Sequence, residues 1–162
     1  MTTFNIEDFL TRTHEGNFST KRPRVPGGEY PGQLADGKAG LDVKIAKTKN
    51  GERFILTLGW EILDDHVRAV TGLDKPRVTQ DVWLDLNSNG DLLRDKTSNI
   101  DLGRLLAGLN LNLGTFSFSQ LRSVGLCKVK VVEDPDKEKK EPDGSPVIYN
   151  RVVAVVLFQG AS

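Results

Sequence analysis

The sequence has little cysteine: Cys127 is the only one among 162 residues. A single cysteine excludes an internal disulfide framework and any zinc site built from several thiolates, so we expect a reducing, intracellular setting. Long apolar runs are also missing, and the longest, VVAVVLF at 152–158, is far too short to cross a bilayer. The first ten residues lack the basic start and apolar block of a secretion signal. We therefore expect a cytoplasmic chain with no membrane partner.

Net charge is absent as well, because 22 lysine and arginine residues balance 22 aspartate and glutamate residues. A neutral protein has no overall field to attract a polyanion, although one local groove can still be basic. The composition, 38% hydrophobic and 27% charged, is typical of one folded domain of this length. Basic residues outnumber acidic ones between residues 11 and 30, where they are Arg12, Lys21, Arg22 and Arg24.

Most of the chain after residue 28 has the period of two that is typical of β-strands. LDVKIAK at 41–47 alternates apolar and polar residues, and the KNG that ends at Gly51 suits a tight hairpin turn. The next run, 52–63, places a set of apolar residues on one face: Phe54, Leu56, Leu58, Trp60 and Ile62. Further strands are predicted over 77–86, 126–133 and 147–158.

One segment between the third and fourth predicted strands has a helical period instead. Its apolar stripe consists of Leu102, Leu105, Leu106 and Leu109. Ser98, with Asp101 three residues later, resembles a capping box and predicts that the helix starts there. Three strands, a helix and two strands form the element order of an OB-fold, a five-stranded antiparallel barrel. We predict a mainly β, OB-fold-like domain over 29–162, preceded by an extended N-terminal arm over 1–28, where Pro and Gly break the periodicity.

The stretch DLNSNGDLLRDK at 85–96 has part of the spacing of a calcium-binding loop. Gly90 occupies the sixth position, as an EF-hand requires, but the twelfth is Lys96, where a bidentate glutamate should close the ligand shell. Asn89 followed by Gly90 is a strong turn pair, and the preceding residues form a predicted strand. We interpret the stretch as a turn and expect no metal site.

Few residues point to catalysis. His66 follows Asp64 and Asp65 without a nucleophile in a recognisable motif, and such a run is more typical of a polar loop than of a metal ligand set. No phosphate-cradling GxxxxGK[ST] motif occurs. Cys127 lies on the apolar side of its predicted strand, where we expect a buried thiol. We expect neither an enzyme nor a cofactor; a magnesium-dependent nuclease at residues 64–66 is a weak alternative.

Several segments together resemble a family of phage-encoded single-stranded-DNA-binding proteins of replication and recombination modules. They are GEYPGQL (28–34), VWLDLNSNGDLLRDKTSNIDLGRLLAGLNLN (82–112), FSFSQLRSVGLCKVKVV (116–132) and YNRVVAVV (149–156), within a similarity that covers roughly 26–158. The resemblance implies DNA binding in the host cell cytoplasm, beside a recombinase or polymerase. At its end, LFQGAS, the chain departs from many single-stranded-DNA-binding proteins, because it lacks the acidic, aromatic-tipped tail that recruits replication partners in several of them. This departure counts against partner recruitment by a tail, though not against DNA binding.

Binding of single strands without sequence preference requires cations for the phosphates and aromatic faces for the bases. Trp83 is the leading candidate because it lies on the polar face of its strand, between Asp81 and Asp85; the alternative is that the arm or a neighbouring subunit covers it. Trp60 follows the apolar face and is expected in the core. The other candidates are Lys44, Lys47, Lys49 and Arg53 around the first hairpin, Lys128 and Lys130 on the fourth strand, Tyr149 and Arg151 on the last, and Arg22 and Arg24 in the arm.

Each of these residues also has a structural interpretation, since hairpin lysines are often only solvated and Tyr149 could close a barrel end. The alternative function is that of a β-rich structural or adaptor protein of a phage particle, acting through protein contacts. The neutral charge and the apolar FNIEDFL at 4–10 favour this alternative. An arm ahead of a barrel commonly reaches a neighbouring subunit, so we expect a homo-oligomer.

Overall fold

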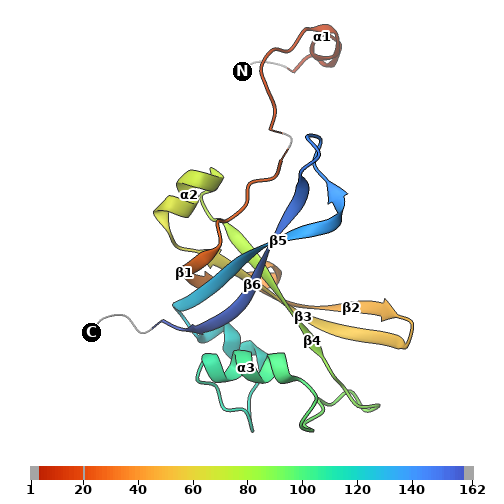
Figure 1. Ribbon diagram of the computed structural model, residues 1–162, viewed down its shortest axis with the longest axis vertical. Coiled ribbons are helices and arrows are strands. Elements are labelled where there is room, and N and C mark those ends of the chain that lie inside the picture. The colour runs from red at the N-terminus through yellow and green to blue at the C-terminus, as the bar shows by residue number, and fades with distance from the viewer. Residues whose placement is uncertain (1–3, 20, 159–162) are drawn as a thin grey trace.

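A computed structural model describes residues 4–19 and 21–158 and confirms a mainly β protein (Figure 1). The strands are β1 (Gly28–Leu34), β2 (Leu41–Thr48), β3 (Gly51–Ile62), β4 (Arg77–Leu84), β5 (Cys127–Lys140) and β6 (Pro146–Leu157). The helices are α1 (Ile6–Thr11), α2 (Asp65–Thr71) and α3 (Ile100–Gly108), with short 3-10 helices η1 (Gly37–Ala39) and η2 (Phe118–Ser123). None of the helices in the described ranges is long and apolar enough to cross a membrane.

All six strands belong to one antiparallel sheet in which β3 is central. β3 pairs with β4 along one edge and, along the other, with β2 and then with β1. β1 continues the sheet to β5, and β5 pairs with β6. β4 and β6 come close to each other, but within the described residues no ladder joins them, so the sheet is open. The extra strand relative to the five predicted is β1, whose GEYPGQL sequence has no clear alternation.

The core lies on one face of this sheet and under α3. Leu56, Leu58, Trp60 and Ile62 of β3 are fully buried, so the predicted apolar face of this strand is confirmed. The indole Nε1 of Trp60 donates a hydrogen bond of 2.9 Å to Oε1 of Gln80, which satisfies its one polar group. Because side chains alternate along a strand, the opposite face of β2, β3 and β4 is left for solvent.

Two helices connect the strands. α3 lies between β4 and β5, as predicted, and packs against both β4 and β6; a Cβ on Gly108 would collide with the carbonyl oxygen of Val155. α2 was not predicted. Its signals are nevertheless present, since Asp64 accepts a hydrogen bond of 2.9 Å from the backbone N–H of Val67, and Gly72 ends the helix at φ 71°.

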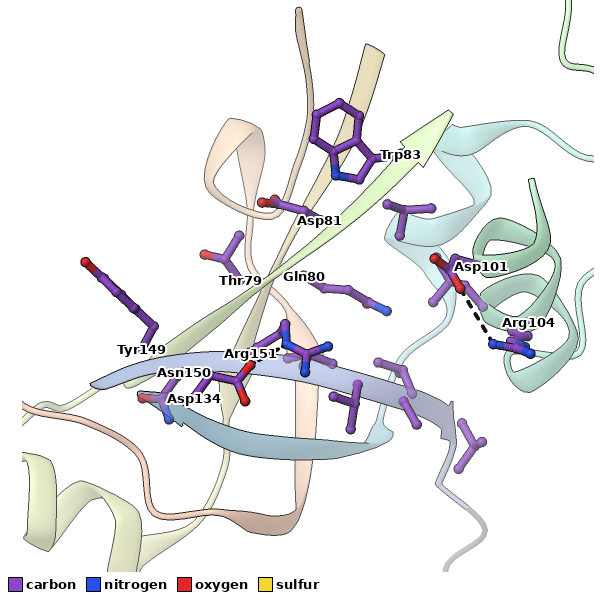
Figure 2. A pocket seen from close by; sticks show the side chains of 17 residues that line it. Thr79, Gln80, Asp81, Trp83, Asp101, Arg104, Asp134, Tyr149, Asn150 and Arg151 are labelled. Carbon is purple, nitrogen blue, oxygen red and sulfur yellow. Dashed lines mark hydrogen bonds and ion pairs between the residues drawn. The ribbon is translucent and has the colours of Figure 1, made fainter. Parts of the chain in front are cut away.

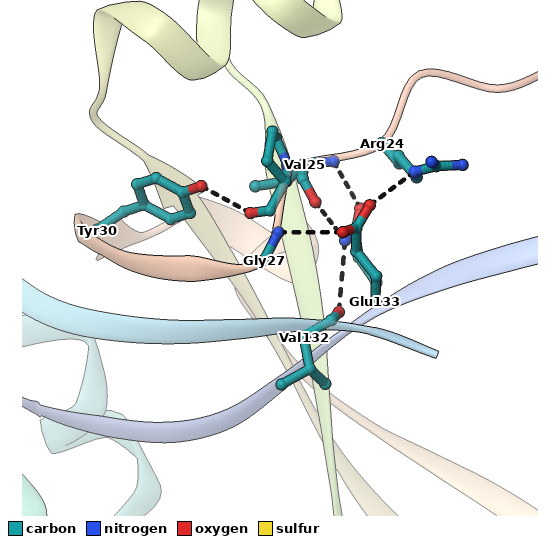
Figure 3. Close-up of polar contacts among 8 residues, drawn as sticks. Arg24, Val25, Gly27, Tyr30, Val132 and Glu133 are labelled. Atoms are coloured by element: carbon teal, nitrogen blue, oxygen red, sulfur yellow. Dashed lines mark hydrogen bonds and ion pairs between the residues drawn. The ribbon is translucent and has the colours of Figure 1, made fainter. Parts of the chain in front are cut away.

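The end of the N-terminal arm is attached to the β5–β6 hairpin. Val25 is only 3% exposed, and Asn150 holds its backbone twice, accepting from its N–H at 2.8 Å and donating to its carbonyl at 2.7 Å. Arg24 forms an ion pair of 2.6 Å with Glu133 (Figure 3). Lys21 lies 2.8 Å from Asp143, and hydrogen bonds from Lys21 and Ser145 hold the pKa of the Asp143 carboxyl below its usual range. Residues 4–18, by contrast, are exposed.

Cys127 is a fully buried thiol, as predicted, and burial raises its pKa to about 11. Because the thiolate is the reactive form, at pH 8 we expect a thiol reagent to modify the native protein at least ~100-fold more slowly than the protein unfolded in urea. The measurement is the rate of release of the coloured leaving group. Complete labelling of the native chain at the unfolded rate would contradict the burial of this side chain.

Candidate nucleic-acid interface

The outer face of β2, β3 and β4 brings three of the predicted site residues together. In the strand register Trp83 lies opposite Ile55, and Ile55 lies opposite Lys44. Arg53 is two residues before Ile55 and therefore shares its face. Trp83 is 42% exposed, so the indole is neither in the core nor fully covered by the arm.

Arg53 and Asp85 fix the surroundings of this indole. The guanidinium carbon of Arg53 lies 4.8 Å from the centre of the Trp83 ring, which is within the range of a cation–π contact. Nη2 of Arg53 is 3.0 Å from Oδ1 of Asp85, and Oδ2 of Asp85 accepts from the backbone N–H of Asn99 at 2.9 Å. The ring therefore stands beside a cation that is itself held in place.

A hollow of about 680 Å³, called here the β4–β6 hollow, continues this surface between β4 and β6, which are not paired with each other. It is lined by residues 79–83 of β4, residues 149–156 of β6, and Asp101, Arg104 and Leu105 of α3, with Asp134 of β5. Figure 2 shows Trp83 and Tyr149 well apart, with Arg151 between Tyr149 and α3. Two exposed aromatic rings and two arginines thus line one elongated depression.

Each arginine of this surface has an aspartate partner. Nε of Arg151 is 2.6 Å from Asp134, and Nη1 of Arg104 is 3.7 Å from Asp101. With the Arg53 pair, these contacts leave the surface close to neutral, and Asp81 adds a negative charge. Exposed ion pairs of this kind contribute only about 0–1 kcal/mol, so a phosphate can compete for the guanidinium groups.

The remaining candidates are not among the residues that line the β4–β6 hollow. Lys47 is on the other face of β2, opposite Glu52, and Lys49 is in the hairpin turn. Lys128 and Lys130 are exposed on β5, opposite Val156 and Ala154 of the hollow's lining, and Lys128 lies 3.0 Å from Glu29. Arg22 and Arg24 remain in the arm, and Arg24 is paired with Glu133. Arg104 was missed from sequence, although its place on the polar side of the α3 stripe was a usable signal.

The loop after β4 forms the predicted turn. The side-chain oxygen of Asn87 accepts from the N–H groups of Asn89 and Asp91 at 2.9 and 3.0 Å, and Gly90 has φ 85°. The other acidic candidates also make local contacts: Asp64 caps α2, and Asp65 lies 2.8 Å from Arg68. These carboxylates therefore have structural roles in their own segments.

Comparison of the chain with known protein families, curated proteins and solved structures finds no match. The function must therefore be inferred from the side chains that the sheet presents. The exposed rings of Trp83 and Tyr149 and the guanidinium groups of Arg104 and Arg151 lie around one hollow, and aromatic rings with cations are the groups that bases and phosphates require.

Proposed function

We propose that this protein binds single-stranded DNA without sequence preference, along the outer face of β2, β3 and β4 and the β4–β6 hollow. The observation that carries the proposal is the half-exposed indole of Trp83, with Arg53 4.8 Å from the ring centre. A base can stack on this indole while phosphates of the same DNA strand bind Arg53 and, further along the strand, Arg104 and Arg151; stacking accepts every base because each has a π-face.

We further propose that the open sheet is an OB-fold-like barrel. In this interpretation β1 and β2 together take the place of the first strand of that fold, and β3, β4, β5 and β6 follow in order. The position of α3, after β4 and against both β4 and β6, supports the proposal, because the OB-fold has its helix between strands three and four. The open side between β4 and β6 is then where the DNA strand enters.

The resemblance to phage-encoded single-stranded-DNA-binding proteins gives this activity a setting. We propose that the protein protects transient single strands in the host cell cytoplasm during phage replication or recombination, as an oligomer beside a recombinase or polymerase. No catalytic step is part of this role, and no cofactor takes part in it.

Titration with oligo(dT) at 50 and 200 mM salt tests the proposal. We expect quenching of tryptophan fluorescence, and this signal reports on Trp83 because Trp60 is buried. If three or four phosphates are neutralised, the affinity should fall by roughly 20- to 50-fold between the two salt concentrations, because each contact releases condensed counterions. No quenching at low salt, or equal affinity for duplex DNA, would refute the proposed function.

A structural or adaptor role in a phage particle is the second candidate, and the exposure of the N-terminal arm favours it. Phe18 is 94% exposed and α1 has no buried residue. Large exposed apolar side chains that cluster in this way mark protein contacts. Assembly without any nucleic acid, together with no binding of oligo(dT), would select this role over DNA binding.

A further inference from the structure

The N-terminal arm carries an apolar surface that its own chain does not cover. Its large apolar side chains, all exposed, are Phe4, Ile6, Phe9, Leu10 and Phe18. The rings of Phe4 and Phe9 contact each other, with centroids 5.2 Å apart, so they present one continuous patch. Exposure of such a patch to water is unfavourable, so this segment has the character of a docking element.

A second hollow, called here the α3 hollow, has the complementary character. It has a volume of about 330 Å³ and lies between the loop that follows β4, α3, and the loop that follows α3. Its apolar lining is formed by Leu92, Leu93, Leu102, Leu106, Leu113 and Phe116. Because an apolar cavity of about 150 Å³ can hold a benzene ring, the α3 hollow has room for one phenyl ring and an aliphatic side chain beside it.

The charges around the two elements are also complementary. The first turn of α1 carries Glu7 and Asp8. The rim of the α3 hollow carries Arg94, whose Nη1 donates to the carbonyl of Leu113 at 2.7 Å, and Lys96 follows two residues later. Asp95 is on the same rim, but its carboxylate accepts hydrogen bonds from Thr97 and Ser98 and is directed into its own loop. An acidic amphipathic segment therefore meets a basic rim around an apolar floor.

The two elements lie at opposite ends of the molecule. Figure 1 shows α1 beyond the β5–β6 hairpin at one end of the longest axis and α3 near the other end. The arm is attached to the hairpin through Asn150 and Glu133, so it leads away from the α3 hollow of its own chain. Because they lie so far apart in one chain, the arm segment and the α3 hollow are better placed to meet between two copies of the protein. A head-to-tail contact of this kind joins different surfaces of the two copies, so it can continue from copy to copy as a row wherever the rotation between copies does not close a ring.

We propose that residues 4–18 of one copy dock into the α3 hollow of a second copy, with Phe9 and Leu10 on its apolar floor and Glu7 and Asp8 toward Arg94 and Lys96. The contact forms a head-to-tail row. It goes beyond the proposed DNA binding and does not depend on it. On a single strand, the row gives neighbouring copies a mutual contact and therefore cooperative coverage.

The test uses the full chain without nucleic acid, so its failure and the failure of DNA binding are distinguishable. A photo-crosslinking residue replaces Phe9, and the products are mapped by mass spectrometry. We expect a ladder of dimers and longer products, with crosslinks to residues 92–116 of the second copy. Crosslinks only within one chain, crosslinks to the exposed Val43 and Ile45 of β2, or no products at all would overturn the proposal.

A charge-reversal series measured by sedimentation provides the second readout. Arg94→Glu combined with Lys96→Glu should weaken self-association by about tenfold, and adding Glu7→Lys and Asp8→Lys should restore it, because both ion pairs are then rebuilt with opposite polarity. Rescue also demonstrates that the Arg94→Glu, Lys96→Glu variant is folded. Ile45→Glu, which changes an exposed apolar residue outside the α3 hollow, is the matched control and should leave association unchanged. Equal weakening by Ile45→Glu, or no rescue, would contradict the docking site.

Discussion

Replacing Trp83 with alanine should weaken the binding of oligo(dT) by roughly 5- to 150-fold, because a base stacked on an aromatic side chain contributes about 1–3 kcal/mol. The indole is 42% exposed on the outer face of the sheet, so its removal leaves no cavity in the core. Fluorescence anisotropy of a labelled oligonucleotide is the appropriate measurement, since the variant loses its reporting tryptophan.

The control for this experiment is Trp83→Phe, which keeps a ring face and should retain most of the affinity. The salt dependence should also stay the same in Trp83→Ala, because no cation is removed. Wild-type affinity in Trp83→Ala, or an equal loss in Trp83→Phe, would contradict base stacking at this position.

Replacing Asn99 with alanine should lower the free energy of unfolding by about 2–4 kcal/mol, because its side chain binds three backbone groups that would be left without partners. Its Oδ1 accepts from the N–H of Asp85 at 2.8 Å, and its Nδ2 donates to the carbonyls of Asp85 and Leu93, both at 2.9 Å. Asn99 also has φ 55°, which is unfavourable for alanine. Urea unfolding followed by the fluorescence of buried Trp60 measures the change.

Asn110 provides a matched control near the other end of α3. It has φ 57° and is exposed, and within residues 4–19 and 21–158 its side chain makes no hydrogen bond. Asn110→Ala should therefore lower the free energy of unfolding by only about 1 kcal/mol, which is the cost of placing alanine at a positive φ. If the two variants are equally destabilised, the three hydrogen bonds from the Asn99 side chain to the backbone of Asp85 and Leu93 contribute little to stability.

Local periodicity was sufficient to predict the faces of β3 and β4 and the helix α3, but on β2 the apolar side chains of Val43 and Ile45 are 46% and 60% exposed. The alternation in β3 identified Trp60 as a core residue and left Trp83 of β4 on the outer face, because each assignment depends only on neighbours two residues away. The predicted helix cap, Ser98, is one residue before the observed cap, Asn99, for a non-local reason. Ser98 donates to Asp95 instead of capping the helix, while Asp85, fourteen residues earlier, captures Asn99 as the residue before α3.

The candidate site was harder to predict, because strand register decides which charges meet. The strand register places Arg53 on the same face as Lys44 and Trp83, and it places Arg151, opposite Val132, on the same face of β5 and β6 as Lys130. It also pairs Arg151 with Asp134, seventeen residues away, and Arg53 with Asp85, thirty-two residues away. A local sequence pattern cannot reveal partners so many residues apart, and neither ion pair was predicted.

Asn150 occupies an unusual position on β6, with Tyr149 before it and Arg151 after it. Both neighbours line the β4–β6 hollow, while the Asn150 amide grips the backbone of Val25. Asn150 therefore links the arm to the two side chains beside it in the β4–β6 hollow. Under the proposed docking and DNA binding, we expect a contact made by the arm to influence how Tyr149 and Arg151 meet a ligand.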